Sequence, residues 1–187
     1  MSKTIYIVLT ETGSVLSRAI QVYTQENFNH ISIAFDPELK EMYSFGRKHE
    51  NNPLIGGFVQ EDAQSKLLRE ANCAIYQLTV SNTQYEKLRM EIAYFKQYKN
   101  KFKYNFIGLF CVAFRIRLKR DYAFFCSQFI AFLFLRAGIS IDLCPYFIKP
   151  TDFQYIQGIK LCYKGKLTTY RTQSIQHMPI ASIIKIA

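Results

Sequence analysis

The chain has five cysteines and three histidines, and a thiol activated by an imidazole can attack a carbonyl carbon. Cys126 has the most distinctive setting, because in "YAFFCSQFIAFLF", residues 122–134, Cys-Ser-Gln interrupts an otherwise apolar and aromatic run. If Cys126 begins a helix, the helix dipole and unpaired backbone N–H groups favour the thiolate, and the same N–H groups can hold an oxyanion. The alternative is that Cys126 is one of five small, buried hydrophobic residues.

The three histidines differ in their expected surroundings. His30 begins the alternating segment "HISIAFD", residues 30–36, whose period-two pattern predicts a strand with a rigid backbone that would fix the ring. His49 lies in a polar segment and His177 in the C-terminal tail, so both are expected to be exposed and without a catalytic role. The alternative for His30 is a histidine at a strand edge that makes a hydrogen bond and has no catalytic role.

The pattern of apolar residues predicts strands and helices on both sides of the His30 segment. Residues 41–47 are expected to pair antiparallel with residues 30–36 across a short turn at Asp36–Pro37. Residues 48–60, with two Asn, one Pro and two Gly, are predicted to form a surface loop. The other predicted elements are strands at residues 4–10 and 73–81, helices at 13–24, from Thr83, at 104–114 and within 150–158, and a hairpin over 159–170 that turns at Lys164–Gly165.

The segment that begins with Cys126 is predicted to be a buried helix rather than a membrane span. A span needs about 20 mainly apolar residues, and the apolar stretches 106–114 and 123–135 are both shorter. Residues on every face of a helix starting at Cys126 are apolar, which is typical of a helix at the centre of a domain. Ala137–Gly138 provides a natural end to this helix.

Length and composition predict one globular domain, residues 1–187, with 49% hydrophobic residues. The N-terminal apolar run is too short for the core of a signal peptide, so a cytoplasmic protein is expected. The cysteines form no C-x-x-C pair and have no histidine at metal-ligand spacing, so we expect no disulfide framework, no metal site and no cofactor.

The formal net charge of +10 is concentrated in two basic segments, residues 96–103 and 115–120. Such segments can attract nucleic acid, anionic lipid or an acidic polymer, or they can form a solvated rim that keeps the protein in solution. The chain carries no helix-turn-helix, zinc or aromatic RNA-binding signature, so no specific nucleic acid is expected as a partner. Peripheral contact with an anionic surface stays open, and so does the oligomeric state.

The order of the motifs resembles the circularly permuted branch of the NlpC-type papain-like cysteine peptidases. A strand beginning with His ("FNHISIAFD") and an adjacent strand ("EMYSFGR") precede an apolar helix beginning with Cys-Ser ("FFCSQFIAFLF"), as in lecithin:retinol acyltransferase-like relatives. "YNFIG", residues 104–108, looks like the Tyr-containing lead-in of that branch. The resemblance spans roughly residues 5–160 and implies an α+β fold, in which an antiparallel sheet packs against a central Cys-bearing helix and further helices.

The resemblance also implies roles for individual residues. It makes Cys126 the nucleophile and His30 the general base that later protonates the leaving group. It places the group that orients the imidazole on the strand after the histidine, where the alignment points to Tyr43. Glu41 and Ser44 are alternatives on the same strand, because a tyrosine hydroxyl stabilises an imidazolium less than a carboxylate would.

The function implied by the resemblance is a thiol hydrolase that cleaves an amide bond, in a cell-wall-type peptide or a γ-glutamyl amide. The same Cys-His pair would serve a lipid acyltransferase or thioesterase, so the expected partner is a small peptide or acyl substrate. A third hypothesis is a non-catalytic domain whose basic segments bind nucleic acid or an anionic membrane.

Overall fold

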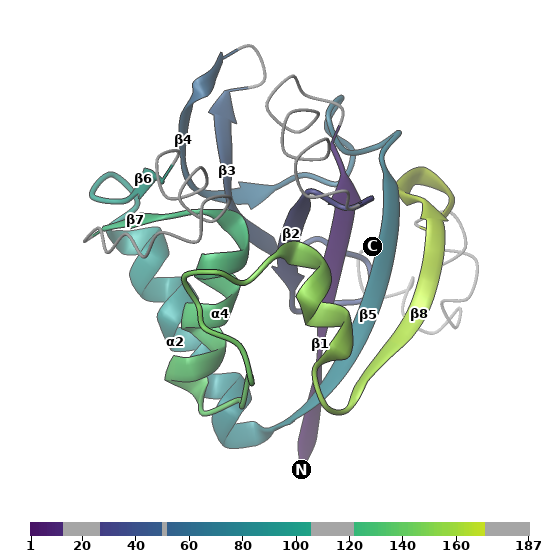
Figure 1. The fold of residues 1–187 in the computed structure, drawn as a ribbon, viewed down its shortest axis with the longest axis vertical. Coiled ribbons are helices and arrows are strands. Elements are labelled where there is room, and N and C mark those ends of the chain that lie inside the picture. Colours follow the sequence, from purple (N-terminus) through teal and green to yellow (C-terminus); the bar gives the residue numbers. More distant parts are fainter. Residues whose placement is uncertain (13–26, 50–51, 106–121, 171–187) are drawn as a thin grey trace, which may run out of the picture.

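The computed structural model describes residues 1–12, 27–49, 52–105 and 122–170, and its main feature is a six-stranded antiparallel sheet (Figure 1). The sheet has the order β4-β3-β2-β1-β5-β8, and β6 and β7 form a separate parallel pair. The strands are β1 (Ser2–Glu11), β2 (His30–Ala34), β3 (Met42–His49), β4 (Asn52–Glu61), β5 (Asn72–Ser81), β6 (Lys103–Tyr104), β7 (Ala123–Phe124) and β8 (Ile159–Lys166). The helices are α2 (Asn82–Gln97), α4 (Cys126–Ala137) and the 3-10 helix η1 (Pro150–Tyr155).

One face of the sheet packs against α2 and α4, which lie side by side in Figure 1. Alternate residues of the strands point to this face, so Ile7 of β1, Ile33 of β2 and Phe45 of β3 are fully buried beneath the helices. The opposite face carries a smaller apolar cluster that includes Val8 and Ala34. The predicted mixture of helices with an antiparallel sheet is therefore confirmed.

The pairing of β2 with β3 is short. Only Ile33 with Tyr43 and Ala34 with Met42 are paired, so the two strands part toward the His30 end of β2. Helix α4 packs against both of these strands, with its first residue at the end where they separate. The local topology thus brings the start of α4 next to His30.

The strands predicted at residues 4–10, 30–36, 41–47 and 73–81 are confirmed as β1, β2, β3 and β5. The surface loop predicted at residues 48–60 is wrong, because β4 occupies Asn52–Glu61 and pairs with β3. The Pro and Gly residues that suggested a loop are tolerated for local reasons. Pro53 is near the start of a strand at the sheet edge, and Gly56 and Gly57 leave room for the neighbouring β6 segment.

Two further predictions need correction. The hairpin predicted to turn at Lys164–Gly165 is wrong, because β8 runs through these residues and pairs with β5 along its length. Tyr104 belongs to β6 and Asn105 lies outside any helix, so the predicted helix over residues 104–114 is wrong at these two positions. Residues 106–114 lie outside the described part of the chain. The predicted helix at residues 13–24 also lies outside them.

Helix α4 begins at Cys126 as predicted and ends at Ala137, followed by the C-cap residue Gly138, whose left-handed backbone (φ 74°) suits glycine. It is not buried on every side, because Leu135 is 51% exposed and Arg136 is exposed. Within the described residues, no helix is long and apolar enough to cross a membrane. The stretch 106–114 lies outside those residues.

Candidate active site

Cys126 is buried at the first position of α4, with Phe129 and Ile130 beneath it in the core. The preceding residue, Phe125, is extended and offers no side-chain hydrogen bond to the helix start. The hydroxyl of Ser127 donates to the carbonyl of Ile148 at 2.6 Å, which ties this turn to the segment before η1. The nucleophilic atom is therefore rigidly placed beside helix N–H groups that no capping side chain uses.

The ring of His30 lies between a thiol and a carboxylate. Its Nε2 is 2.7 Å from Oε1 of Glu61, and the ring also forms a hydrogen bond with Cys126. Because Glu61 occupies Nε2, Nδ1 is the nitrogen left for the sulfur. This is the arrangement in which an imidazole can exchange a proton with a nucleophile while a third group fixes the ring.

The carboxylate of Glu61 accepts hydrogen bonds from two serine hydroxyls as well as facing the imidazole. Ser32 donates to Oε2 at 2.5 Å and Ser44 donates to Oε1 at 2.7 Å. Burial by itself would raise the pKa of Glu61, but the charge of His30 and the hydrogen bonds from His30 and both serines lower it. Glu61 is therefore held as a charged, oriented acceptor.

The pKa of His30 is raised to about 10. Burial would lower this pKa, but the carboxylate of Glu61 outweighs burial, with added contributions from a hydrogen bond and the charge at Cys126. The imidazole is consequently protonated at neutral pH. Protonated His30 is therefore a proton donor next to the Cys126 sulfur.

Tyr104 places a second donor at the sulfur. Its buried hydroxyl forms a hydrogen bond with Cys126, and its pKa is raised well above the usual value by burial and then by the charge of Cys126. The hydroxyl therefore stays protonated and can donate. A Cβ on Gly56 would lie 2.7 Å from Cβ of Tyr104, so the absence of a side chain at Gly56 lets Tyr104 sit here.

The structure brings together two of the three predicted catalytic residues, Cys126 and His30. Tyr43, predicted as the third, is fully buried with its ring stacked on Phe58 at 6.0 Å between ring centres, and its hydroxyl has no hydrogen-bond partner among the described residues. The carboxylate at the imidazole is that of Glu61.

The two alternatives to Tyr43 have different surroundings. Glu41 forms an ion pair with Arg89 of α2, whereas Ser44 donates to Glu61 and so belongs to the site. Glu61 was missed because its strand was predicted as a loop. The available signal was the run "LIGGFVQE", which contains β-forming residues and ends in a carboxylate.

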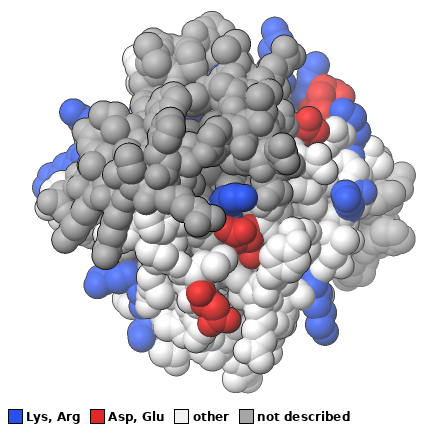
Figure 2. Space-filling model, in the orientation of Figure 1, with Lys and Arg blue, Asp and Glu red and all other residues white. Residues whose placement is uncertain are grey.

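Two lysines of the basic segment 96–103 lie against aromatic rings. Lys96 lies 4.6 Å from the ring centre of Tyr43, and Lys101 lies 4.8 Å from that of Tyr98, so both cations rest on aromatic faces. Figure 2 shows the described basic side chains on one face spread mainly around its rim, with acidic groups among them. Residues 115–120 lie outside the described part of the chain.

No protein-family model matches the chain, and no match was found among curated proteins or solved structures. The case for a function therefore rests on the geometry of Cys126, His30 and Glu61.

Proposed function

We propose that the protein is a thiol hydrolase that cleaves an amide bond, with Cys126 as nucleophile, His30 as acid and base, and Glu61 as the group that orients the imidazole. The observation that carries the proposal is the His30 ring, which contacts the Cys126 thiol and the Glu61 carboxylate together. A histidine with only a structural role would need one hydrogen-bond partner. His30 instead contacts both the Cys126 thiol and the charged Glu61 carboxylate.

In the first half of the proposed reaction, the Cys126 sulfur attacks the carbonyl carbon and the carbonyl oxygen gains negative charge. In this proposal the donors to that oxyanion are the Tyr104 hydroxyl, which contacts Cys126, and the uncapped backbone N–H groups at the start of α4. Protonated His30 gives its proton to the leaving nitrogen, the C–N bond breaks and a thioester forms on Cys126.

In the second half, water attacks the thioester carbon while neutral His30 takes a proton from the water. The C–S bond then breaks, which releases the acid and restores Cys126 beside protonated His30. Glu61 stays charged throughout and holds the imidazole through its contact with Nε2. The hydroxyls of Ser32 and Ser44 hold the carboxylate in this position. In this proposal His30 carries the proton in both halves of the reaction, and Glu61 with its two serine donors holds His30 in place.

The substrate class follows from the resemblance to the permuted NlpC-type peptidases, with a histidine strand before the cysteine helix. The antiparallel sheet against a Cys-bearing helix supports this resemblance at the level of architecture. We therefore propose the permuted papain-like arrangement, and a small peptide or γ-glutamyl amide as substrate. Transfer or hydrolysis of a lipid acyl group would use the same residues, so experiment must separate the two.

Mass spectrometry of the intact protein tests the proposal. A panel of activated esters and amides, with short peptidyl, γ-glutamyl and long-chain acyl groups, is incubated with the protein at pH 7. We expect a thioester adduct on Cys126 and release of amine from a peptidyl or γ-glutamyl amide. Cys126→Ala abolishes both, whereas Cys144→Ala, a change at an exposed cysteine outside the site, keeps both.

Adducts from long-chain esters but never from amides would replace the amidase with acyl transfer or thioesterase action. If no acyl donor modifies Cys126, the catalytic proposal is wrong. Salt-sensitive binding of DNA or anionic vesicles that survives Cys126→Ala would then favour the non-catalytic alternative.

A further inference from the structure

Arg47, on β3, forms no ion pair with any residue that the structure describes. Of the four arginines in the described residues, the other three each pair with a glutamate, whereas Arg47 has no ion pair or hydrogen bond to a described residue. Its side chain is half-buried, so water does not fully replace the missing partner. A partly desolvated guanidinium without an anion is costly unless a ligand supplies one.

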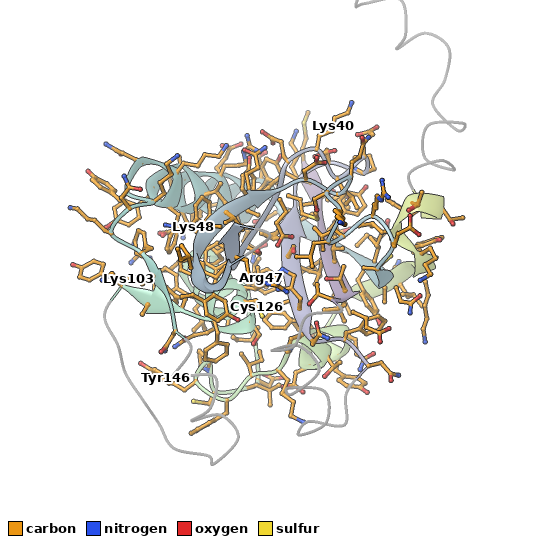
Figure 3. The ribbon with its side chains drawn as sticks, turned by 90° about the horizontal axis from the view of Figure 1, so that it is seen from above. Lys40, Arg47, Lys48, Lys103, Cys126 and Tyr146 are labelled. Atoms are coloured by element: carbon orange, nitrogen blue, oxygen red, sulfur yellow. The ribbon has the colours of Figure 1, made fainter. Side chains whose placement is uncertain are left out.

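Arg47 lies on the same side of the sheet as the nucleophile. It follows Tyr43 and Phe45 at two-residue spacing, and both of those side chains are buried in the core that includes Cys126. Burial raises the pKa of Tyr104, and the positive charge of Arg47 opposes that rise, so the guanidinium acts on the hydroxyl that contacts the Cys126 sulfur. In the view of Figure 3, the labelled Arg47 and Cys126 project onto the same part of the molecule.

The strand paired with β3 places no side chain directly opposite Arg47. The residue paired with Arg47 across the sheet is Gly56, which has no side chain to shield or bind the guanidinium. Further positive charge is close in the fold, because Lys103 adjoins Tyr104 on β6 and Lys48 lies over Gly57.

We infer that Arg47 binds a carboxylate or phosphate group of the substrate, close to the carbonyl that Cys126 attacks. A guanidinium suits both anions, because its N–H groups match two oxygens at once. The inference rests on the proposed function and narrows it, since the preferred substrate is an acyl compound with an anionic group near the scissile bond.

Two thiol reagents of similar shape and different charge test the inference without requiring hydrolysis. In both, the Cys126 sulfur displaces iodide, so the C–S bond forms as the C–I bond breaks. Iodoacetate carries a carboxylate and iodoacetamide is neutral. We expect Arg47→Gln to lower the ratio of their rate constants at Cys126, iodoacetate over iodoacetamide, by about tenfold, corresponding to about 1.4 kcal/mol.

Matched variants make this result specific. Arg69→Gln removes the same charge from an exposed arginine and keeps the wild-type ratio, and Arg47→Lys keeps a ratio between those of wild type and Arg47→Gln. An unchanged ratio in Arg47→Gln overturns the inference while leaving the catalytic proposal intact. If neither reagent modifies Cys126 while both modify the exposed Cys144, the proposed function fails and the inference falls with it.

Competition identifies the anion. Glutarate and inorganic phosphate are each added during alkylation of Cys126 by iodoacetamide, with chloride at the same ionic strength as the control. Protection by glutarate indicates a carboxylate substrate, and protection by phosphate indicates a phosphorylated one. In either case Arg47→Gln loses the protection. Protection by neither anion overturns the inference.

Discussion

Among single residues, the site depends on the protonation states of His30 and Glu61: the imidazole is protonated and the carboxylate is charged. Glu61 has three donors around it and a lowered pKa, so it can hold His30 protonated despite burial. A tyrosine in this position could orient the ring but could not supply the charge. The contact between His30 and Glu61 is therefore the feature that turns a buried cysteine into a candidate nucleophile.

Replacing Glu61 by Gln tests this division of charge. The amide keeps the size of the side chain but removes the charge that raises the pKa of His30 to about 10. We expect the pKa of His30, followed by NMR of the ring protons, to fall, and kcat/KM to fall by roughly 100- to 10,000-fold, as when a triad carboxylate is neutralised.

Glu86→Gln, an exposed change on α2, is the matched control and leaves both quantities at wild-type values. A Glu61→Gln variant that keeps the wild-type pKa of His30 would show that another group sets this pKa.

At the scale of elements, β4 and β6 complete the site that α4 and β2 begin. Strand β4 ends in Glu61 and, five residues earlier, carries Gly56, against which Tyr104 packs. The backbone carbonyl of Gly46 is also 2.9 Å from where a Cβ on Gly56 would lie, so the position is enclosed by two neighbours. Strand β4 thus carries the Glu61 carboxylate and also provides the space in which Tyr104 packs.

A methyl group at Gly56 is expected to displace Tyr104 from the sulfur. We predict that Gly56→Ala lowers kcat by roughly 100- to 1,000-fold, the loss that follows removal of one oxyanion donor, and that KM changes less. The loss should match that of Tyr104→Phe, and the double variant should be no worse than either single one.

Ile55→Ala is the control for the strand itself, because Ile55 is the exposed neighbour of Gly56. Additive losses in the double variant would mean that Gly56 does not act through Tyr104.

The elements that could be predicted from the sequence were those with clear periodicity. The alternation in "HISIAFD" predicted the strand that aims His30, and the Cys-Ser start of an apolar run predicted α4. Strand β4 could not be found in this way, because its Asn, Pro and Gly residues are typical of loops, and their tolerance depends on contacts with β3 and β6 that are distant in sequence. Because β4 was not predicted, Glu61, which is 31 residues from His30 in the sequence, was not predicted as a site residue either.

At the scale of the whole molecule, the buried ion pair links the site to stability. The pKa of His30 is about 10 in the fold against 6.5 in an unfolded chain, so its contribution to the free energy of unfolding is full below pH 6.5 and disappears as pH rises to about 10. The pKa of Glu61 is lowered from 4.5, so its contribution is present above pH 4.5 and is lost as pH falls through the folded-state value. The pair therefore stabilises the fold most between about pH 4.5 and 6.5.

Urea unfolding at several pH values measures this dependence. We expect the free energy of unfolding of the wild type to fall between pH 6.5 and pH 10 more steeply than that of Glu61→Gln, whose His30 lacks the raised pKa. Glu86→Gln should follow the wild-type slope. Parallel slopes for wild type and Glu61→Gln would show that the pair makes no such contribution.

The most direct measurement of the central claim is the rate at which each cysteine is alkylated by iodoacetamide at pH 6, followed by peptide mass spectrometry. An ordinary thiol is less than about 1% thiolate at this pH. We predict that Cys126 reacts at least about tenfold faster than the exposed Cys144, and that His30→Ala removes this advantage. Alkylation of Cys126 no faster than that of Cys144, or equally fast in His30→Ala, would contradict it.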